Sequence, residues 1–153
     1  MEWAVWAVWV EWVDSDKHLD HIGIVIRDPE TADKIAQALG IIPGPAKVID
    51  DRGIRVVKLN TANTTLELIS PVRPDSEVEN FLQTRGPGLH HICFSTKDIE
   101  QSIRKFKDVG IDMIPNSRRK GAEGRDVVFF HPRDTGGILI ELEAENGGND
   151  EDN

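Results

Sequence analysis

Residues 88–94 read Gly-Leu-His-His-Ile-Cys-Phe, and residues 19–24 read Leu-Asp-His-Ile-Gly-Ile. His21 of the earlier stretch stands 70 residues before His91, the second histidine of the later one. The same interval separates other landmarks around the two stretches, namely Asp28 from Asp98 and Gly40 from Gly110. The chain therefore contains one module written twice, and the rest of the sequence is organised around that repeat.

Each copy opens with an expected β-strand that is followed by a helix. The strands cover residues 19–26 and 89–95, where period-2 alternation sets each histidine on one strand face. An aspartate that can cap a helix and a closing glycine frame the next segments. The sequence therefore predicts helices at 28–39 and 98–109.

Three further strands are expected in each copy, which makes each copy a βαβββ module. They lie at 47–50, 54–60 and 64–70 in the first module, and at 111–114, 126–131 and 138–143 in the second. Glu67 and Glu141 occupy matching places in the last strands but stand 74 residues apart. We therefore expect four extra residues in the second module, in the loop 118–125.

The length and composition predict one domain of the α+β class. A chain of 153 residues that is 39% hydrophobic can bury a single core, so two duplicated halves would share it. The predicted domain covers 17–145. It consists of module one at 19–71, a linker with one small helix at 72–87, and module two at 88–144.

Both ends of the chain differ in composition from this domain. Residues 1–16 hold all four tryptophans, but they lack a signal peptide's basic start and are shorter than the roughly 20 residues of a membrane span. We expect a tryptophan-rich N-terminal extension without a catalytic role. Residues 146–153 contain no apolar side chain, which predicts a disordered acidic tail.

The formal charge of −9 argues against nucleic acid or an anionic membrane as the main partner, because the field of the protein repels polyanions. The single cysteine, Cys93, excludes an intramolecular disulfide framework and a thiolate metal cluster. A reducing cytoplasm is the simplest location, and a buried apolar thiol is the simplest role for Cys93.

Each module places a histidine in its first strand and a glutamate in its last. If those strands pair and the sheet curves, His21, Glu67, His91 and Glu141 can point into one concavity. Two imidazoles and two carboxylates suit Co²⁺, Ni²⁺, Mn²⁺ or Zn²⁺, with positions left open for catalysis. The alternative is a pair of hydrogen-bonded histidines and two glutamates on a wet strand face. By strand parity His90 points to the opposite face, and we expect a structural role for it; His131 is expected to shape the turn before the last hairpin.

Several blocks in this order resemble the methylmalonyl-CoA epimerase family of the vicinal oxygen chelate (glyoxalase) superfamily. The resemblance covers about residues 19–143. Its blocks are 19–24, Leu-Glu-Leu-Ile-Ser-Pro at 66–71, Asp75-Ser76 with Phe81-Leu82, Arg85-Gly86-Pro87-Gly88-Leu89-His90-His91-Ile92, Phe130-His131-Pro132, and Thr135 through Leu142. The superfamily fold implies that the two modules form one curved mixed β-sheet around a cavity, with flanking helices.

The resemblance implies inversion at C2 of an acyl-CoA substrate, methylmalonyl-CoA, through an enediolate. It also implies one divalent metal ion, Co²⁺ first among the four, held by His21, Glu67, His91 and Glu141. Glu141 and Asp51 match the family's proton-transfer pair, although Asp51 is one methylene shorter than the family's glutamate. A homodimer is likewise implied by the resemblance.

The segment 118–125 concentrates cations in an acidic chain. Arg118, Arg119 and Lys120 can meet the phosphates of coenzyme A, since arginine and lysine are common phosphate ligands. Ordinary surface charge is the competing interpretation, because no phosphate-loop pattern is present.

Three rival functions share the expected fold. A glyoxalase I-like lactoylglutathione lyase uses a similar set of two histidines and two glutamates. A metal-free small-molecule-binding protein has no need of four such residues in symmetric positions. Ring-cleaving dioxygenases use two histidines and one carboxylate with Fe(II), but their chains are usually longer.

Overall fold

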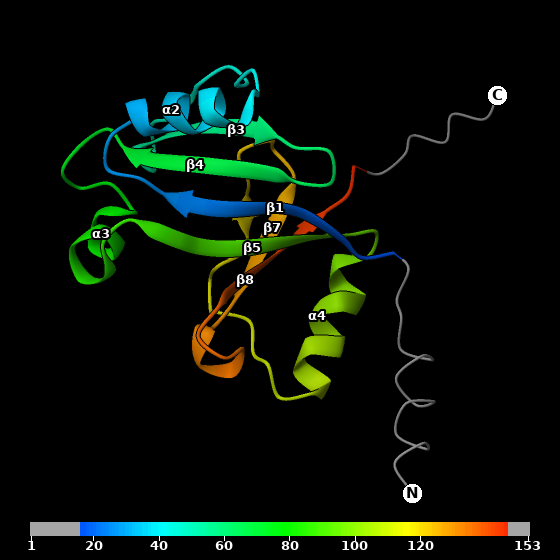
Figure 1. Ribbon diagram of the computed structural model, residues 1–153. Helices are drawn as coiled ribbons and strands as arrows, with labels where there is room; N and C mark the ends of the chain where they lie inside the picture. Colours follow the sequence, from blue (N-terminus) through cyan, green and yellow to red (C-terminus); the bar gives the residue numbers. More distant parts are fainter. Residues whose placement is uncertain (1–15, 147–153) are drawn as a thin grey trace, which may run out of the picture.

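The computed structural model describes residues 16–146. The predicted N-terminal extension and acidic tail therefore lie almost wholly outside the described residues. Between residues 16 and 146, no helix combines the length and apolar character needed to cross a membrane. The described part of the chain forms one sheet with three α-helices, shown in Figure 1.

Module one follows the expected order of strand, helix and three strands. Its first helix begins close behind Asp28, whose Oδ1 accepts a hydrogen bond from the backbone N–H of Glu30, and Gly40 ends it with a φ of 66°. The elements are β1 (His18–Val25), α2 (Glu30–Leu39), β2 (Lys47–Ile49), β3 (Ile54–Asn60) and β4 (Thr65–Pro71).

Module two repeats this order after a short connecting helix. Asp98 caps its helix by accepting a hydrogen bond from the backbone N–H of Gln101 at 2.9 Å. The elements are α3 (Glu79–Arg85), β5 (Gly88–Thr96), α4 (Ile99–Asp108), β6 (Arg119–Lys120), β7 (Asp126–Phe130), the 3₁₀ turn η1 (Pro132–Asp134) and β8 (Leu139–Ala144).

Two predictions about module two are wrong. No strand covers 111–114, where only Met113 forms an isolated bridge to Phe130; the first of the three strands is β6 at 119–120. The four extra residues also lie elsewhere. The connection between β7 and β8 spans 131–138, whereas the matching connection in module one spans only 61–64. The insertion therefore holds η1 and leaves the loop after β6 almost unchanged in length.

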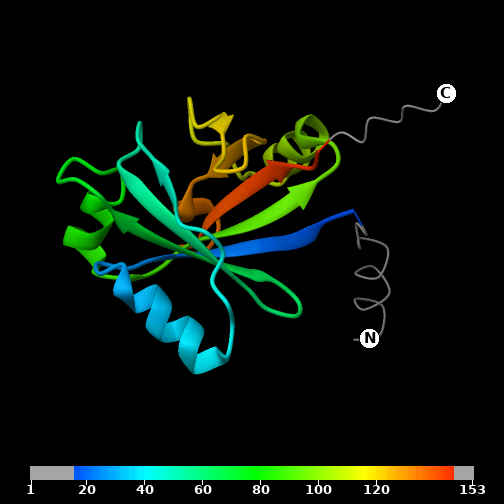
Figure 2. The same ribbon diagram turned by 90° about the horizontal axis from the view of Figure 1, so that it is seen from above.

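The eight strands form one mixed sheet in the order β2-β3-β4-β1-β5-β8-β7-β6. Within each module the first and last strands pair in parallel, and antiparallel pairing of β1 with β5 joins the modules. Figure 1 shows β1 and β5 side by side across the centre of the molecule. Figure 2 shows from above how the strands change direction across the sheet, so that the sheet is curled rather than flat.

Helices α2 and α4 occupy matching places on the outer face of the sheet. Ala32 and Ala36 of α2 pack with Val57 and Leu68, while Phe106 of α4 stacks on Phe130 at a ring distance of 4.0 Å. The third core cluster lies beside α3 and includes Val25, Val56, Val78 and Leu82. Because the outer face is covered, the inner faces of β1, β4, β5 and β8 are left to line a cavity.

Candidate functional site

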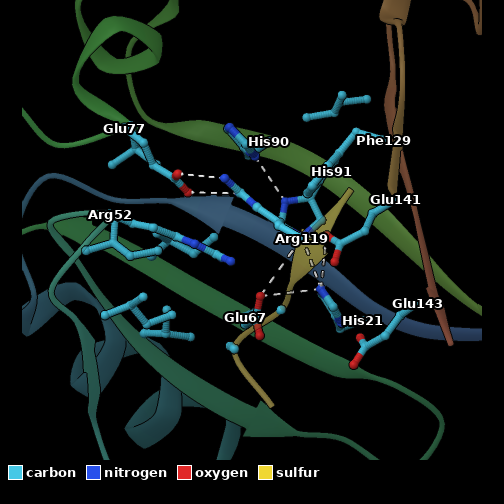
Figure 3. Close-up of a pocket in the computed structure, with 18 of the residues that line it drawn as sticks. His21, Arg52, Glu67, Glu77, His90, His91, Arg119, Phe129, Glu141 and Glu143 are labelled. Atoms are coloured by element: carbon cyan, nitrogen blue, oxygen red, sulfur yellow. Dashed lines mark hydrogen bonds and ion pairs between the residues drawn. The ribbon is translucent and has the colours of Figure 1, made fainter. Parts of the chain in front are cut away.

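The two repeated histidines meet at the junction of the modules. The Nε2 atoms of His21 in β1 and His91 in β5 lie 3.0 Å apart, and the two rings are nearly perpendicular. Both side chains are buried. Figure 3 shows the two rings converging from neighbouring strands, as the repeat in the sequence predicted.

The two repeated glutamates point to the same place from the last strands. Glu141 Oε2 of β8 lies 3.1 Å from His91 Nε2 and 3.9 Å from His21 Nε2. Glu67 Oε2 of β4 lies 3.3 Å from His21 Nε2 and 4.0 Å from His91 Nε2. The structure thus brings all four predicted ligand residues together, each only 4–6% exposed.

The spacing of these donor atoms suits a metal ion. Two ligand atoms bound at about 2.1 Å, at angles of roughly 90–109°, are about 3.0–3.4 Å apart. The His–His, His91–Glu141 and His21–Glu67 distances of 3.0, 3.1 and 3.3 Å fall in that range. His21, His91 and Glu141 form the compact group, with ligand atoms all within 4.8 Å of one another. These three residues can hold a metal ion, and Glu67 adjoins them beside His21.

Burial and neighbouring charges shift the pKa values of Glu141, His21 and His91 in different directions. Burial raises the pKa of Glu141 to about 7; the charge of His21 opposes this rise and Glu67 reinforces it. Burial also works against a charge on His21, but its hydrogen bond with Asp20 and the carboxylates of Glu67 and Glu141 raise its pKa overall. Burial, reinforced by the charge of His21, holds the pKa of His91 well below its usual range. The site therefore favours a proton on His21 more than on His91.

The register of the central strand pair creates room for His91. His21 pairs with Cys93 across the β1–β5 ladder, and Gly23 pairs with His91. A Cβ atom on Gly23 would lie 2.1 Å from Cε1 of the His91 ring, far inside van der Waals contact. Only glycine leaves space there for the imidazole.

The group lies in a cavity of about 300 Å³, and a partly exposed ion pair stands at the rim of this cavity. The guanidinium of Arg119 donates two hydrogen bonds to Glu77, at 3.0 and 3.2 Å, and lies over the Phe129 ring with its central carbon 5.2 Å from the ring centre. Figure 3 shows Arg119 reaching across the mouth of the site toward Glu77. Cation–π contact and bidentate pairing together fix this arginine.

The three predicted phosphate-binding cations do not face the same way, because side chains alternate along the strand. Arg119 faces the cavity, whereas Arg118 and Lys120 do not line it. Arg118 pairs with Glu100 and Asp126, and Lys120 Nζ lies 2.6 Å from Asp126 Oδ1. Both outer cations are thus engaged with carboxylates on the surface.

Asp51 lies apart from the four converging residues. Its side chain is exposed in the turn between β2 and β3, and it is not among the residues that line the cavity. Its backbone carbonyl accepts a hydrogen bond from Arg73 at 3.3 Å. Its neighbour Arg52 does line the cavity and donates a hydrogen bond to the backbone carbonyl of Lys120.

His90 corrects the prediction made from strand parity. It does not point to the opposite face: it lines the cavity, its Nδ1 lies 3.0 Å from Nδ1 of His91, and its ring meets the edge of Phe81. The reason is an irregularity in β5, where Gly23 pairs with His91 but Ile24 pairs with Leu89. His90 is the extra residue of a β-bulge, which breaks the alternation of faces.

The positions of Cys93 and His131 agree with the roles expected for them from the sequence. Cys93 is buried, and burial together with the nearby carboxylates raises the pKa of its thiol far above the usual range, which disfavours the reactive thiolate. His131 lies outside the cavity and accepts a hydrogen bond from the Arg133 backbone at the start of η1, which fits the expected turn-shaping role.

Sequence reasoning missed the cavity residues that come from loops and edge strands. Glu77 stands in the linker, and Arg52 and Lys58 come from the hairpin of β2 and β3. Lys58 Nζ lies 3.8 Å from Glu67 Oε1 and 2.9 Å from Glu123 Oε1. No repeat in the sequence marks these residues: the place of Lys58 opposite Glu67, for example, is taken in module two by Phe129 opposite Glu141.

Comparison with known proteins agrees with this fold and site. Residues 20–129 match the model of the Glyoxalase/Bleomycin resistance protein/Dioxygenase superfamily. The chain is 35% identical over 127 residues to the mitochondrial methylmalonyl-CoA epimerase of Homo sapiens, covering 82% of this chain and 72% of that protein. It is 34% identical over 128 residues to an ethylmalonyl-CoA/methylmalonyl-CoA epimerase of Cereibacter sphaeroides, covering 82% and 96%.

A solved structure of methylmalonyl-CoA epimerase from Mycobacterium tuberculosis superimposes with a TM-score of 0.75 at 30% identity, covering 85% of this chain and 89% of that one. The superfamily match covers most of the described residues, and the two relatives each cover four-fifths of the chain. The chain therefore belongs to the methylmalonyl-CoA epimerase family of the glyoxalase, bleomycin resistance protein and dioxygenase superfamily.

Proposed function

We propose that the protein interconverts (R)- and (S)-methylmalonyl-CoA by removing and returning the proton at C2. The observation that carries this proposal is the convergence of two buried histidines and two buried glutamates in one cavity. The names of the relatives support the choice of substrate. A solved methylmalonyl-CoA epimerase in complex with methylmalonyl-CoA, at 30% identity and a TM-score of 0.74, supports it further.

In this proposal His21, Glu67, His91 and Glu141 hold one divalent metal ion. Co²⁺ is our first choice, and Mn²⁺, Ni²⁺ and Zn²⁺ suit the same nitrogen and oxygen donors. When bound, such an ion supplies Lewis-acid stabilisation of negative charge on substrate oxygens. The distances between the donor atoms support this assignment.

Glu141 is the proposed carrier of the proton on one face of the substrate. Its buried carboxyl, with a pKa raised to about 7, can both accept and release a proton near neutral pH. Because this residue also stands among the proposed ligands, its free oxygen would have to reach the C2 proton. The cavity walls of β5 and β8 exclude bulk water from this carboxyl, which is 6% exposed.

Asp51 stays our predicted carrier on the opposite face. Its place beside Arg52, a cavity residue, supports the assignment, although its own carboxylate is exposed. An Asp51→Asn variant should exchange deuterium into one stereoisomer and fail to exchange into the other, because only one proton carrier remains. Equal exchange into both stereoisomers would remove Asp51 from the mechanism.

The finer features of the proposal concern coenzyme A, assembly and location. Arg118, Arg119 and Lys120 are proposed to meet the phosphates of coenzyme A; Arg119 lines the cavity and the other two flank it in the chain, which supports the idea. A homodimer is proposed from the family resemblance. A reducing cytoplasm is proposed because the lone cysteine is buried and reduced.

The decisive experiment follows deuterium incorporation at C2 of methylmalonyl-CoA in D₂O. Metal-reconstituted protein should exchange the proton rapidly, and a His91→Ala variant should lose the exchange. Circular dichroism of both proteins checks that the variant folds. No exchange above background from folded, metal-loaded protein would refute the epimerase assignment, and the hemithioacetal of methylglyoxal and glutathione would then be the next substrate to assay.

A further inference from the structure

The residue that precedes each repeated histidine is left without a partner in the central ladder. Along β1, Leu19 pairs with Phe94 and His21 pairs with Cys93, so Asp20 is skipped. Along β5, His91 pairs with Gly23 and Leu89 pairs with Ile24, so His90 is skipped. The two irregularities fall 70 residues apart, at matching positions of the repeat.

A β-bulge changes where a side chain points. Consecutive residues of a regular strand face opposite sides of the sheet, so they cannot contact each other's side chains on one face. An extra residue cancels this alternation locally. Both bulged residues accordingly reach the ring of the histidine that follows them.

The contact is made to the same atom in both modules. Asp20 Oδ2 lies 2.8 Å from Nδ1 of His21, and His90 Nδ1 lies 3.0 Å from Nδ1 of His91. In each case the contacted nitrogen is the one turned away from the junction, because the two Nε2 atoms face each other at 3.0 Å. Figure 3 shows the contact between His90 and His91.

The contact with Asp20 decides which nitrogen of the His21 ring carries its proton, and the contact with His90 allows the same arrangement in the His91 ring. An ionised carboxylate only accepts hydrogen bonds, so the neutral ring of His21 must hold its proton at Nδ1 and keep the Nε2 lone pair free. A neutral imidazole offers one acceptor nitrogen, and His90 can use it to accept from Nδ1 of His91. A lone pair at Nε2 is what a metal ion requires.

The two bulged residues are themselves fixed. Arg125 Nη2 lies 3.9 Å from Asp20 Oδ1, on the side away from His21, and Arg125 also pairs with Glu143. The ring of His90 meets Phe81 of α3 with ring centres 4.9 Å apart. Neither bulged side chain is therefore free to turn away from its histidine without breaking a second contact.

We propose that Asp20 and His90 are positioning residues which lock His21 and His91 in the Nδ1-protonated tautomer, so that both Nε2 atoms are presented to a metal ion. The proposal rests on the proposed metal site but concerns different residues. The duplicated bulge is the device that places both residues, one in each module. The lock is stronger in module one, where the acceptor is a carboxylate.

The test combines metal affinity with a readout that needs no metal. Competition against a chelator gives the Co²⁺ dissociation constant of the protein. Nitrogen-15 NMR of the imidazole rings in metal-free protein, at an alkaline pH where both rings are neutral, identifies the tautomers. The variants are Asp20→Ala and His90→Phe. Each is compared with an asparagine variant at the same position, Asp20→Asn or His90→Asn, which keeps an acceptor oxygen.

We expect Asp20→Ala and His90→Phe to weaken Co²⁺ binding by about 10–100-fold and to release the tautomer of the following histidine. The asparagine variants should recover part of both effects. A His18→Ala variant, which changes an exposed histidine of the same strand, should bind like the wild type. Thermal unfolding identifies any variant that fails to fold. In that case the asparagine variant at the same position is compared with the wild type instead.

Wild-type affinity together with wild-type tautomers in both Asp20→Ala and His90→Phe would overturn the proposal. A wild-type protein that binds no Co²⁺ would instead contradict the proposed metal site. Because the NMR readout is taken without metal, the two failures are distinguishable: the tautomers still show whether the bulged residues control the rings.

Discussion

The two modules share a backbone plan but support their histidines differently. In module one, the residue opposite His91 is Gly23, which leaves the imidazole room against the strand. In module two, the residue opposite His21 is Cys93, whose buried Sγ lies within 4.8 Å of a ring nitrogen of His21. The repeat therefore fixes where the proposed ligand residues stand, while the small residues across the β1–β5 seam differ between the two rings.

The largest expected effect of this asymmetry concerns the two carboxylates, Glu67 and Glu141. Glu141 belongs to the compact group, whereas Glu67 sits beside Lys58 at its edge. We expect Glu141→Gln to lower the rate of C2 exchange by about 10²–10⁴-fold, since it removes the proposed proton carrier as well as a proposed donor atom for the metal ion. Glu67→Gln should cost only about tenfold, mainly in metal affinity.

Exchange rates and Co²⁺ dissociation constants, measured on both variants, separate these effects. Equal losses in the two variants would mean that the modules contribute equivalent carboxylates. The observed difference in packing would then have no chemical consequence.

The seam itself gives the second test. Gly23→Ala should displace the His91 ring, because the added methyl group would lie 2.1 Å from it, and we expect Co²⁺ binding to weaken by about 100-fold. Cys93→Ala is the matched change on the other side and only removes a sulfur atom, so metal binding should stay close to that of the wild type.

Isothermal titration with Co²⁺ compares the two seam variants, and urea unfolding reports their stability. If Gly23→Ala kept wild-type affinity, the space under His91 would not be what holds that ring. A comparable loss in Cys93→Ala would equally abolish the distinction between the two sides.

The smallest expected effect is the pH dependence of the free energy of unfolding. The folded-state pKa of Glu141 is raised to about 7, so the folded metal-free protein binds this proton more tightly than the unfolded chain, and stability is lost as the pH rises through 7. The raised pKa of His21 acts in the same direction. The lowered pKa of His91 acts in the opposite direction, but its contribution is complete once the pH exceeds its ordinary value of 6.5.

Metal-free protein should therefore lose about 1 kcal/mol of unfolding free energy from Glu141 between pH 6.5 and about pH 8. Urea unfolding in the presence of a chelator measures this change. A Glu141→Gln variant should show a flatter profile over the same interval. A rise in the stability of the wild type across this interval would contradict the raised pKa of Glu141.

Much of the fold could be predicted because the duplicated strand and helix signals are local. The histidine strands, the Asp98 cap and the closing glycines each depend on a few neighbouring residues, and these are found where the repeat placed them. The expected Asp28 cap is wrong, because Pro29 is the N-cap of α2 and makes no side-chain cap hydrogen bond. The strand expected at 111–114 was wrong because its apolar residues pack against α4 and β7 without forming a ladder.

The candidate site was predictable only as far as alternation holds. His21, Glu67, His91 and Glu141 follow strand parity and converge as expected. His90 does not, since a bulge depends on pairing with a distant strand and leaves no signature in its own segment. Glu77 and Arg119 meet through tertiary contact between the linker and an edge strand, and no sequence period links them.

The pairing of β1 with β5 also orders events during folding. Each module by itself holds one histidine and one glutamate, a pair too sparse for tight metal binding. The complete set of donors exists only after the two halves of the chain have docked along this single seam. Capture of the proposed metal ion would consequently be a late step of assembly: it would secure the finished sheet against separation of its halves, but it would not start the folding of either half.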